Sequence, residues 1–415
     1  MSSLAVLRDA DPGTAGPPSG QTADLAARAA AFGRHLAEGA VDRDLNRRLP
    51  HAEVRALAET GLLAARVPAA HGGREATILE VARVMLHLGA GDPNVAQAVQ
   101  PHLCGVEKIR IHGSDLQKQR YFRHILAGGV ITNANAECSG PVVGDINTTL
   151  RRDGAAWQLH GTKAYCTGSL FASHFYVVAN TEDGVRALAF VPADRAGVTV
   201  LDDWDGFGQR TSSSGTVVLD QVAVADDEVI LLPESGRRRT YEGGFAQLLH
   251  AAIDAGIARA ALADAVAFCR GTARPVAESG VARASEDPYI LQAVGDMSVI
   301  VEGAAALVER AALILDGAAA LALAGRADGP ELDRALGEAS VAVAHAKIAA
   351  NDACLAVSER LFRVGGATAT LRPLGLDRHW RNARTHTTHD PVAYKARVVG
   401  DFLLNDRLPP VNTKF

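Results

Sequence analysis

The stretch Trp157-Gln158-Leu159-His160-Gly161-Thr162-Lys163-Ala164-Tyr165-Cys166-Thr167-Gly168-Ser169 lies where the hydrophobic pattern of the chain changes from helical to strand-like. After a turn at Asp153-Gly154, apolar and polar residues alternate with the period of two that is typical of strands. Short β-rich runs separated by Gly, Asp and Pro follow, at residues 175–179, 187–191, 197–201 and 216–219. Such spacings predict a compact barrel or sandwich, and we place this β domain at residues 129–236.

The residues before the β region have the spacing of amphipathic helices. Apolar residues recur at intervals of three to five between Leu45 and Leu63, and a further run opens at Asp115 and stops at Gly128-Gly129. We therefore expect an N-terminal helical domain over residues 21–128. Residues 1–20 are rich in Ser, Gly, Pro and Asp, and we expect them to form a disordered tail.

Helical periodicity returns after Tyr241 in four long units, at residues 245–270, 288–325, 331–364 and 390–404. Their apolar stripes predict a C-terminal four-helix bundle over residues 237–415. The predicted fold class is therefore α+β, with a helical domain, a β domain and a helical bundle in that order. The stripes are extensive enough that we expect part of this surface to meet another subunit.

The composition excludes several classes of partner. The 415 residues include 42 Lys+Arg and 47 Asp+Glu, a net charge of -5, so there is no basic field for nucleic acid or an anionic membrane. Residues 304–324 are apolar but contain Glu309, Arg310 and Asp316, which indicates a buried amphipathic helix and no membrane span. The first 20 residues lack the pattern of a signal peptide.

The five cysteines are scattered and form no C-x-x-C pair, which argues against a thiolate zinc site or a redox dithiol. A scattered, odd number fits a reducing compartment, so we expect a cytoplasmic protein. His386 and His389 stand three residues apart, but no third ligand is placed by the sequence, and we expect no metal. Dinucleotide-binding, P-loop and serine-hydrolase signatures are missing as well.

Three stretches have the residue types of a functional site. Residues 161–169 place hydroxyls and backbone N–H groups on a turn after a strand, which suits the polar edge of a heterocycle, although a plain β turn explains them too. Residues 203–210 place two aromatic side chains between glycines beside Arg210; a structural corner between strands is the other explanation.

In the third stretch, residues 381–391, two histidines precede a predicted helix start at Asp390-Pro391. Asp followed by Pro is typical of the N-cap and first position of a helix, so we expect Asp390 to be the cap. His389 would then lie at the positive end of that helix, where the field disfavours its charged form. An ordinary surface or core histidine remains the alternative.

Together, these stretches resemble the acyl-CoA dehydrogenase superfamily over residues 21–405. Tyr165-Cys166-Thr167 matches the family's aromatic-x-Thr strand beside the flavin, and residues 206–210 with Ser214-Gly215 resemble its second β-domain signature. Arg270 and Arg274-Pro275 fall where the family's first bundle helix ends near the flavin phosphate. Gly365-Gly366 resembles the Gly-rich turn before the active-site loop.

One departure from the dehydrogenase pattern indicates which branch of the superfamily this chain resembles. Many dehydrogenases of this superfamily carry a catalytic Glu before a Gly-Thr, whereas this chain reads His389-Asp390-Pro391 at that place. Residues 382–395 resemble instead the flavin-dependent monooxygenases of the fold, with dibenzothiophene monooxygenase and related sulfur-acquisition oxidoreductases as the nearest pattern. A histidine near position 102 is part of that pattern.

The resemblance implies a two-component monooxygenase that takes reduced FMN from a separate flavin reductase and forms a C4a-hydroperoxyflavin with O2. It implies a homotetramer and a small organic substrate, with an organosulfur compound as first choice. It also implies site residues: Arg274 and Arg270 for the phosphate, Thr167 and Ser169 for the ring edge or the peroxide, His389 holding the peroxide, His102 facing it, Asn133 or Asn135 as a further donor, and Tyr165 and Arg210 beside the cofactor.

Three other functions remain open at this stage. An FAD-dependent acyl-CoA dehydrogenase would use Asp390 as its base. Aromatic hydroxylation and amine N-oxygenation occur on the same scaffold. A catalytically silent relative would serve only as a binding or assembly partner, since a fold does not fix a function.

Overall fold

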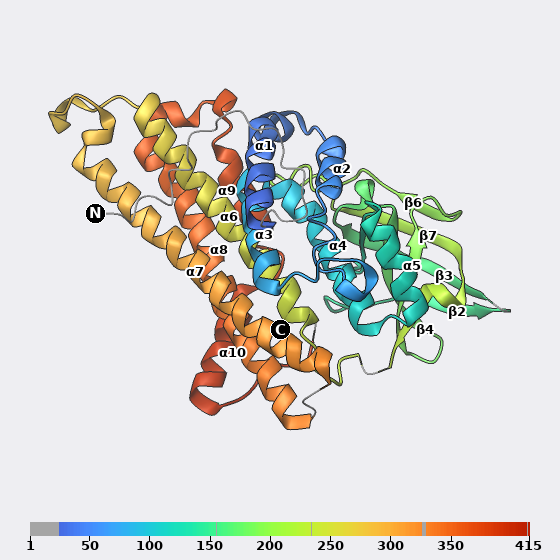
Figure 1. The fold of residues 1–415 in the computed structure, drawn as a ribbon. Coiled ribbons are helices and arrows are strands. Elements are labelled where there is room, and N and C mark those ends of the chain that lie inside the picture. Colours follow the sequence, from blue (N-terminus) through green and yellow to red (C-terminus); the bar gives the residue numbers. More distant parts are fainter. Residues whose placement is uncertain (1–24, 155, 234, 326–328, 413) are drawn as a thin grey trace.

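A computed structural model describes residues 25–154, 156–233, 235–325, 329–412 and 414–415. The predicted tail at residues 1–20 lies outside these ranges. In Figure 1 a helical part, a sheet and a set of long helices follow one another along the chain, which confirms the predicted α+β order. In the described ranges, no helix combines the length and the apolar character that crossing a bilayer requires.

The N-terminal part has five α-helices: α1 (Leu25–Asn46), α2 (His51–Glu59), α3 (Ile78–Gly91), α4 (Pro93–His112) and α5 (Asp115–Leu126). Side-chain caps explain where several of them begin. Asp92 caps α4 by accepting from the backbone N–H of Asn94, and Pro93 occupies the first helical position. Ser114 and Gln117 form a capping box at α5.

The β domain is one eight-stranded sheet with the strands β1 (Ile131–Ala134), β2 (Thr149–Asp153), β3 (Ala156–Cys166), β4 (His174–Thr181), β5 (Arg186–Pro192), β6 (Val198–Val200), β7 (Gly215–Val224) and β8 (Val229–Leu232). The strand order is β6-β7-β3-β2-β4-β5-β8, and β1 pairs with β4. Side chains of β4 alternate between two cores: Phe175 packs with Leu219 of β7, and Tyr176 packs with Phe122 of α5. The sheet therefore encloses one core and rests on α4 and α5 with its other face.

The C-terminal part consists of α6 (Glu242–Gly271), α7 (Pro288–Ala324), α8 (Gly329–Gly365), α9 (Asp377–His386) and α10 (Val392–Asn405). The long helices α6, α7 and α8 share one core with α1 and α3 of the N-terminal part (Figure 1). The sequence did not predict α9, which contains the beginning of the stretch at residues 381–391. Its buried face is mostly polar, formed by His379, Asn382, Ala383 and His386, so the hydrophobic period that marks other helices is missing.

Candidate active site

The fold brings the three stretches together. The backbone N–H of Gly168, after β3, donates to the carbonyl of Ser212 at 3.0 Å. The backbone N–H of Gln209, in the loop before β7, donates to Oδ1 of Asn382 on α9 at 2.7 Å. The β3 turn, the loop at residues 203–214 and α9 therefore form one continuous region, although about 220 residues separate its ends in the sequence.

Gly208 explains how closely the loop approaches α9. A Cβ atom at this position would overlap the carbonyl group of Arg381. Arg381 in turn donates from Nη1 to the carbonyl of Phe207 at 3.1 Å, and the ring of Phe207 stacks on Trp380 with 6.1 Å between centroids. The aromatic residue between the two glycines is thus a docking contact between the β domain and α9.

A cluster of buried hydroxyl groups lies where the β3 turn meets this loop. Oγ1 of Thr167 is 2.9 Å from Oγ of Ser214, and Oγ of Ser169 is 3.1 Å from Oγ of Ser213. Ser212 bonds to Ser214 at 2.7 Å. A hydroxyl offers one donor and two acceptor positions, so these bonds hold Thr167 and Ser169 in place and leave each able to bind a ligand.

Helix α4 contacts all three stretches. Oδ1 of Asn94 accepts from the backbone N–H of Thr211 at 3.1 Å, and Oε1 of Gln97 lies 3.0 Å from Nε2 of His386. The carbonyl of Ala98 lies so close to Gly168 that a Cβ there would overlap it. Most residues of α4 are buried, so this helix is a rigid support beneath the site.

Several buried polar atoms near these elements have no hydrogen-bond partner among the residues that the structure describes. They include Oδ1 of Asn133 and of Asn135, both amide atoms of Gln209 and the hydroxyl of Thr385. Asn133 lies in β1, and Asn135 comes directly after the last residue of that strand. Each unpaired buried group costs about 1–3 kcal/mol. This set fits a polar ligand that carries both donors and acceptors.

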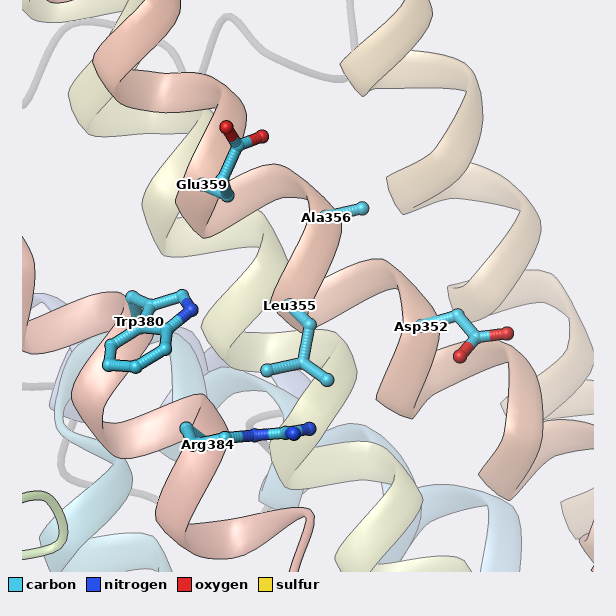
Figure 2. A pocket seen from close by; sticks show the side chains of 6 residues that line it. All are labelled: Asp352, Leu355, Ala356, Glu359, Trp380 and Arg384. Carbon is cyan, nitrogen blue, oxygen red and sulfur yellow. The ribbon is translucent and has the colours of Figure 1, made fainter. Parts of the chain in front are cut away.

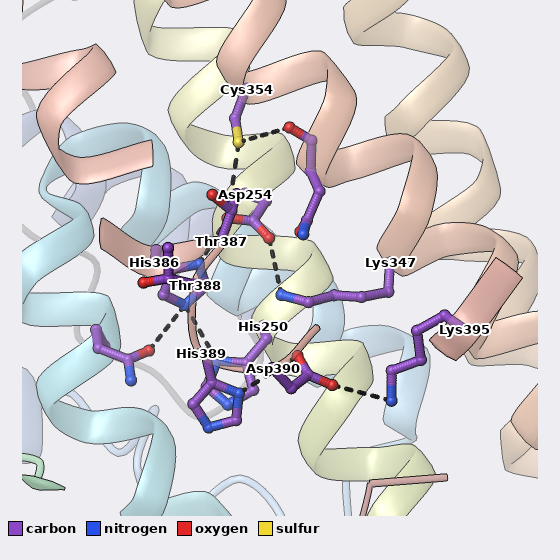
Figure 3. Close-up of polar contacts among 12 residues, drawn as sticks. His250, Asp254, Lys347, Cys354, His386, Thr387, Thr388, His389, Asp390 and Lys395 are labelled. Atoms are coloured by element: carbon purple, nitrogen blue, oxygen red, sulfur yellow. Dashed lines mark hydrogen bonds and ion pairs between the residues drawn. The ribbon is translucent and has the colours of Figure 1, made fainter. Parts of the chain in front are cut away.

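His389 lies in the connector between α9 and α10 and presents an imidazole to solvent. Its side chain is 44% exposed, and its ring packs on His250 of α6 with 4.1 Å between centroids. Its Nδ1 is 3.6 Å from Oδ1 of Asp390. Figure 3 shows His389 and His250 side by side, with Asp390 next to them.

Behind these rings is a buried polar network that the sequence did not reveal. Nδ1 of His386 lies 2.6 Å from Oδ1 of Asp254, and Nε2 lies 3.0 Å from Nδ1 of His250. Nζ of Lys347 donates to Oδ2 of Asp254 at 3.0 Å (Figure 3). Burial opposes the charge on Asp254, but His386 and Lys347 outweigh it and lower its pKa. The only signal was polar residues inside apolar runs, with His250 and Asp254 four apart on α6.

The predicted cap at Asp390 is wrong. Helix α10 begins at Val392, Pro391 occupies the N-cap position, and no side chain bonds to the end of the helix. Asp390 is buried and pairs through Oδ2 with Nζ of Lys395 at 3.1 Å. Burial works against its ionisation, but the neighbouring His389 and the charge of Lys395 prevail and lower its pKa.

The structure does not place His102 in the open part of this site. Its ring is fully buried on α4; Nδ1 accepts from the backbone N–H of Ile131 at 3.0 Å, and Nε2 lies 3.1 Å from the carbonyl of Leu63. Burial lowers its pKa to about 4, so the ring is neutral and Nε2 is the donor. Both nitrogens thus join α4 to β1 and to the segment after α2, which does not fit the expected contact with a peroxide.

Two other predicted residues border the site. The guanidinium of Arg210 donates to the backbone carbonyl of Asp44, near the end of α1, at 2.6 Å. Tyr165 is 58% exposed and meets Trp204 edge to face, with 6.4 Å between centroids. Arg210 therefore anchors the loop to the N-terminal part, while the Tyr165 ring is open to a ligand or a partner.

Arg270 and Arg274 are not brought to the other predicted residues. Both are exposed, and they lie at and beyond the far end of α6. At a rise of 1.5 Å per residue, Arg270 is roughly 30 Å along the helix from His250. One chain therefore does not bring these arginines to a ligand that also touches His389.

Two adjoining cavities lie over the outer surface of α8 and α9. One of about 540 Å³ is lined by Trp380, Arg384, Glu359, Ala356, Leu355 and Asp352 (Figure 2). The other, of about 400 Å³, shares Asp352, Leu355 and Arg384 with it and reaches Asp390. Neither is lined by Thr167 or Ser169. Within the described ranges, no group of three or more His, Cys, Asp or Glu side chains is arranged to hold a metal.

Comparison with known proteins gives concordant matches along the chain. Family models of the N-terminal, middle and C-terminal domains of acyl-CoA dehydrogenase match residues 21–129, 135–222 and 248–393. A dibenzothiophene monooxygenase of Rhodococcus qingshengii is 34% identical over 91% of this chain and 94% of its own length.

Two solved structures are similar to the whole fold. The dibenzothiophene monooxygenase TdsC of Paenibacillus sp. A11-2, in complex with FMN and indole, has a TM-score of 0.88 and 30% identity, covering 94% of this chain and 99% of that one. The methanesulfinate monooxygenase MsuC of Pseudomonas fluorescens has a TM-score of 0.86 and 32% identity, with the same coverage.

Proposed function

The chain belongs to the acyl-CoA dehydrogenase family, and from this premise we propose that it is a two-component flavin-dependent monooxygenase. It uses reduced FMN and O2 to oxygenate a small organic substrate, with an organosulfur compound as the first choice. The relatives named for dibenzothiophene and methanesulfinate support this choice of substrate class.

The observation that carries the proposal is the contrast between His389 and Asp390. A dehydrogenase needs a carboxylate base that is aimed at a C–H bond. Asp390 is buried and bonded to Lys395, and its lowered pKa makes it a weak base. His389 instead presents a half-exposed ring that can donate a hydrogen bond, held in place by its contact with His250.

The residues present fit a flavin. The unpaired amide oxygens of Asn133 and Asn135 and the amide of Gln209 offer acceptors and a donor of the kind that the edge of an isoalloxazine ring requires. The hydroxyls of Thr167 and Ser169 add further positions. These residues would hold the ring edge of the flavin, which in its reduced form would supply the oxygenating chemistry with O2.

The chain's own residues then perform two tasks. His389 donates a hydrogen bond at the reacting oxygen, where charge develops. Packing around Thr167, Ser169 and His250, all of which are buried, keeps water away from the reacting atoms, which prevents wasteful release of hydrogen peroxide.

The partners follow from the same proposal. A separate reductase supplies the reduced FMN, and the protein is a homotetramer in the cytoplasm, where its five free thiols remain reduced. Arg274, with Arg270 as its neighbour, binds the FMN phosphate. Because these arginines lie so far from His389 in one chain, a neighbouring subunit supplies them.

The decisive experiment is product analysis. The purified protein is given FMN, a flavin reductase with NADH, O2 and a panel of organosulfur compounds, phenols and amines. Sulfoxide or sulfone products are expected. Hydroxylated phenols or N-oxygenated amines would instead assign phenols or amines as the substrate class. Anaerobic bleaching of a bound FAD by acyl-CoA thioesters, without oxygenated products, would overturn the proposal.

A further inference from the structure

Asp254 and Lys347 form an ion pair in the interior of the helical bundle. Both side chains are fully buried, and Nζ of Lys347 is 3.0 Å from Oδ2 of Asp254. Burying such a pair costs much of what its attraction returns, and apolar replacements of the same size are often neutral or stabilising. Stability alone is therefore a weak explanation for this pair. Only His386 separates Asp254 from His250, whose ring packs on His389, and this position suggests a role in the site.

The remaining contact of Asp254 fixes a proton. An ionised carboxylate only accepts hydrogen bonds, so Nδ1 of His386, at 2.6 Å, must be the donor. In the neutral ring of His386, Nε2 is then an acceptor. Nδ1 of His250 lies 3.0 Å from that nitrogen, so His250 must donate from Nδ1 and keep Nε2 as its acceptor.

Gln97 fits this arrangement only with its amide turned over. Its amide group lies 3.0 Å from the same Nε2 of His386, so the NH2 group, in place of Oε1, faces that nitrogen and shares its one lone pair with Nδ1–H of His250. The geometry thus forms a directed chain from Asp254 through His386 to His250, whose ring packs on His389.

We propose that Asp254 is a positioning residue that fixes, through His386, which nitrogen of His250 carries a proton, and so holds the buried ring on which His389 packs in one orientation and one tautomer. The inference rests on the proposed function, because the pair borders the flavin site. The remote carboxylate thereby determines which edges of His386 and His250 accept and which donate behind the ring of His389.

The positive and negative charges around the His250 and His386 rings are equal in number. Asp254 faces Lys347 and the thiol of Cys354 on α8, and Asp390 faces Lys395 on α10. Each carboxylate is thus paired with one lysine, which leaves no net charge to hold an imidazolium. Burial, with the neighbouring His389 and His386, keeps the pKa of His250 well below its usual value, and burial lowers that of His386 despite Asp254.

The first test measures the tautomers directly in the protein without cofactor. Nitrogen-15 NMR of the imidazoles separates Nδ1–H from Nε2–H rings, and the variants His386→Gln and His250→Gln assign the signals. We expect both rings as Nδ1–H between pH 6 and 9. Signals for Nε2–H in either ring of the unaltered protein would overturn the proposal.

The variant Asp254→Asn leaves Lys347 buried without a partner, so the main test uses Asp254→Asn with Lys347→Met, which removes both charges and keeps the volume. The proposal expects a mixture of tautomers at His386 in this folded double variant. It also expects roughly tenfold less product per flavin oxidised, more hydrogen peroxide, and unchanged FMN affinity. Unchanged tautomers together with an unchanged coupling, that is, an unchanged amount of product per flavin oxidised, would overturn the proposal.

Glu107→Gln is the matched control. Glu107 is also a buried carboxylate in an ion pair, with Arg66, and accepts from Tyr241 at 2.6 Å, but it has no contact with the imidazoles among the described interactions. This variant should be less stable than the unaltered protein and should form as much product per flavin oxidised. An equal loss of coupling in Glu107→Gln would assign the effect to stability and overturn the proposal. If the unaltered protein makes no product, the proposed function fails, while the tautomer measurement still decides the role of Asp254.

Discussion

The imidazole rings of His250 and His389 lie 4.1 Å apart between centroids, at an angle of 34°. His250 is buried and bonded to His386, whereas the side chain of His389 is 44% exposed. The exposed ring of His389 is therefore held in place by a buried ring. An ordinary surface histidine has no such support.

Replacing His389 by Ala should remove most oxygenation. Loss of one donor at a position where charge develops costs about 2.7–4 kcal/mol of barrier, roughly 10²–10³ in kcat. FMN binding should remain measurable, and hydrogen peroxide should rise as product falls. Thr388→Ala is the control, because the neighbouring exposed hydroxyl bonds only to the carbonyl of Thr385 among the described contacts. Near-normal product formation by His389→Ala would reject the assigned role.

Replacing Arg274 by Ala should weaken FMN binding much more than it changes the chemistry of the bound complex. A charge-assisted bond to phosphate contributes about 1.5–3 kcal/mol, so the Kd should rise roughly 10- to 100-fold. Because the proposed function assigns this phosphate contact to a neighbouring subunit, FMN affinity of the unaltered protein should also fall on dilution. A fluorescence titration at several protein concentrations measures both effects, and unchanged affinity in the variant contradicts the prediction.

Gly208→Ala should destabilise the contact between the β domain and α9. The added methyl would overlap the carbonyl of Arg381, and overpacking of this kind typically costs about 1–3 kcal/mol. Urea unfolding measures the loss. Gly317→Ala in α7 is the control, since its Cβ would meet nothing within 4 Å, and it should be neutral or stabilising by up to about 1 kcal/mol. Equal stability of both variants would show that the close approach is relaxed in solution.

His102 should make the protein less stable in mild acid. Burial lowers its pKa from 6.5 to about 4, so between these values the unfolded chain binds a proton that the folded chain does not. The free energy of unfolding should therefore fall as the pH drops from 6.5 to 4, by roughly 3 kcal/mol from this residue. His102→Gln keeps a donor and an acceptor and should flatten that decline.

The control for this pH dependence is His160→Gln on β3, whose ring is 62% exposed. Equal slopes for His102→Gln and the unaltered protein, measured by urea unfolding at each pH, would contradict the prediction.

The order of helical domain, sheet and bundle could be predicted because each part repeats its apolar residues with a single period. Helix α9 could not, because its buried positions at 379, 382, 383 and 386 are mostly polar and satisfy that period only once their partners are known. Those partners lie on α4, on α6 and in the loop before β7, far away in the sequence.

The site residues depend more on the family resemblance than on a period. Thr167 and Ser169 were predicted from that resemblance, and the structure packs their turn against residues 212–214, while their contact with a ligand stays a prediction. Asp254 and Lys347 were missed, because a single polar residue in an apolar helix gives no sign of what it faces. The pattern at His102 gave no information about which backbone groups its nitrogens bond.

One consequence concerns attempts to re-engineer the protein. Asn94, Gln97 and Ala98 are neighbours on α4, yet each contacts a different part of the site. Substitutions at these three positions should show strong epistasis with changes elsewhere, because each one alters the position of α4, which contacts all three parts of the site. Libraries that aim at new specificity should therefore leave this helix intact and diversify the loops that it carries.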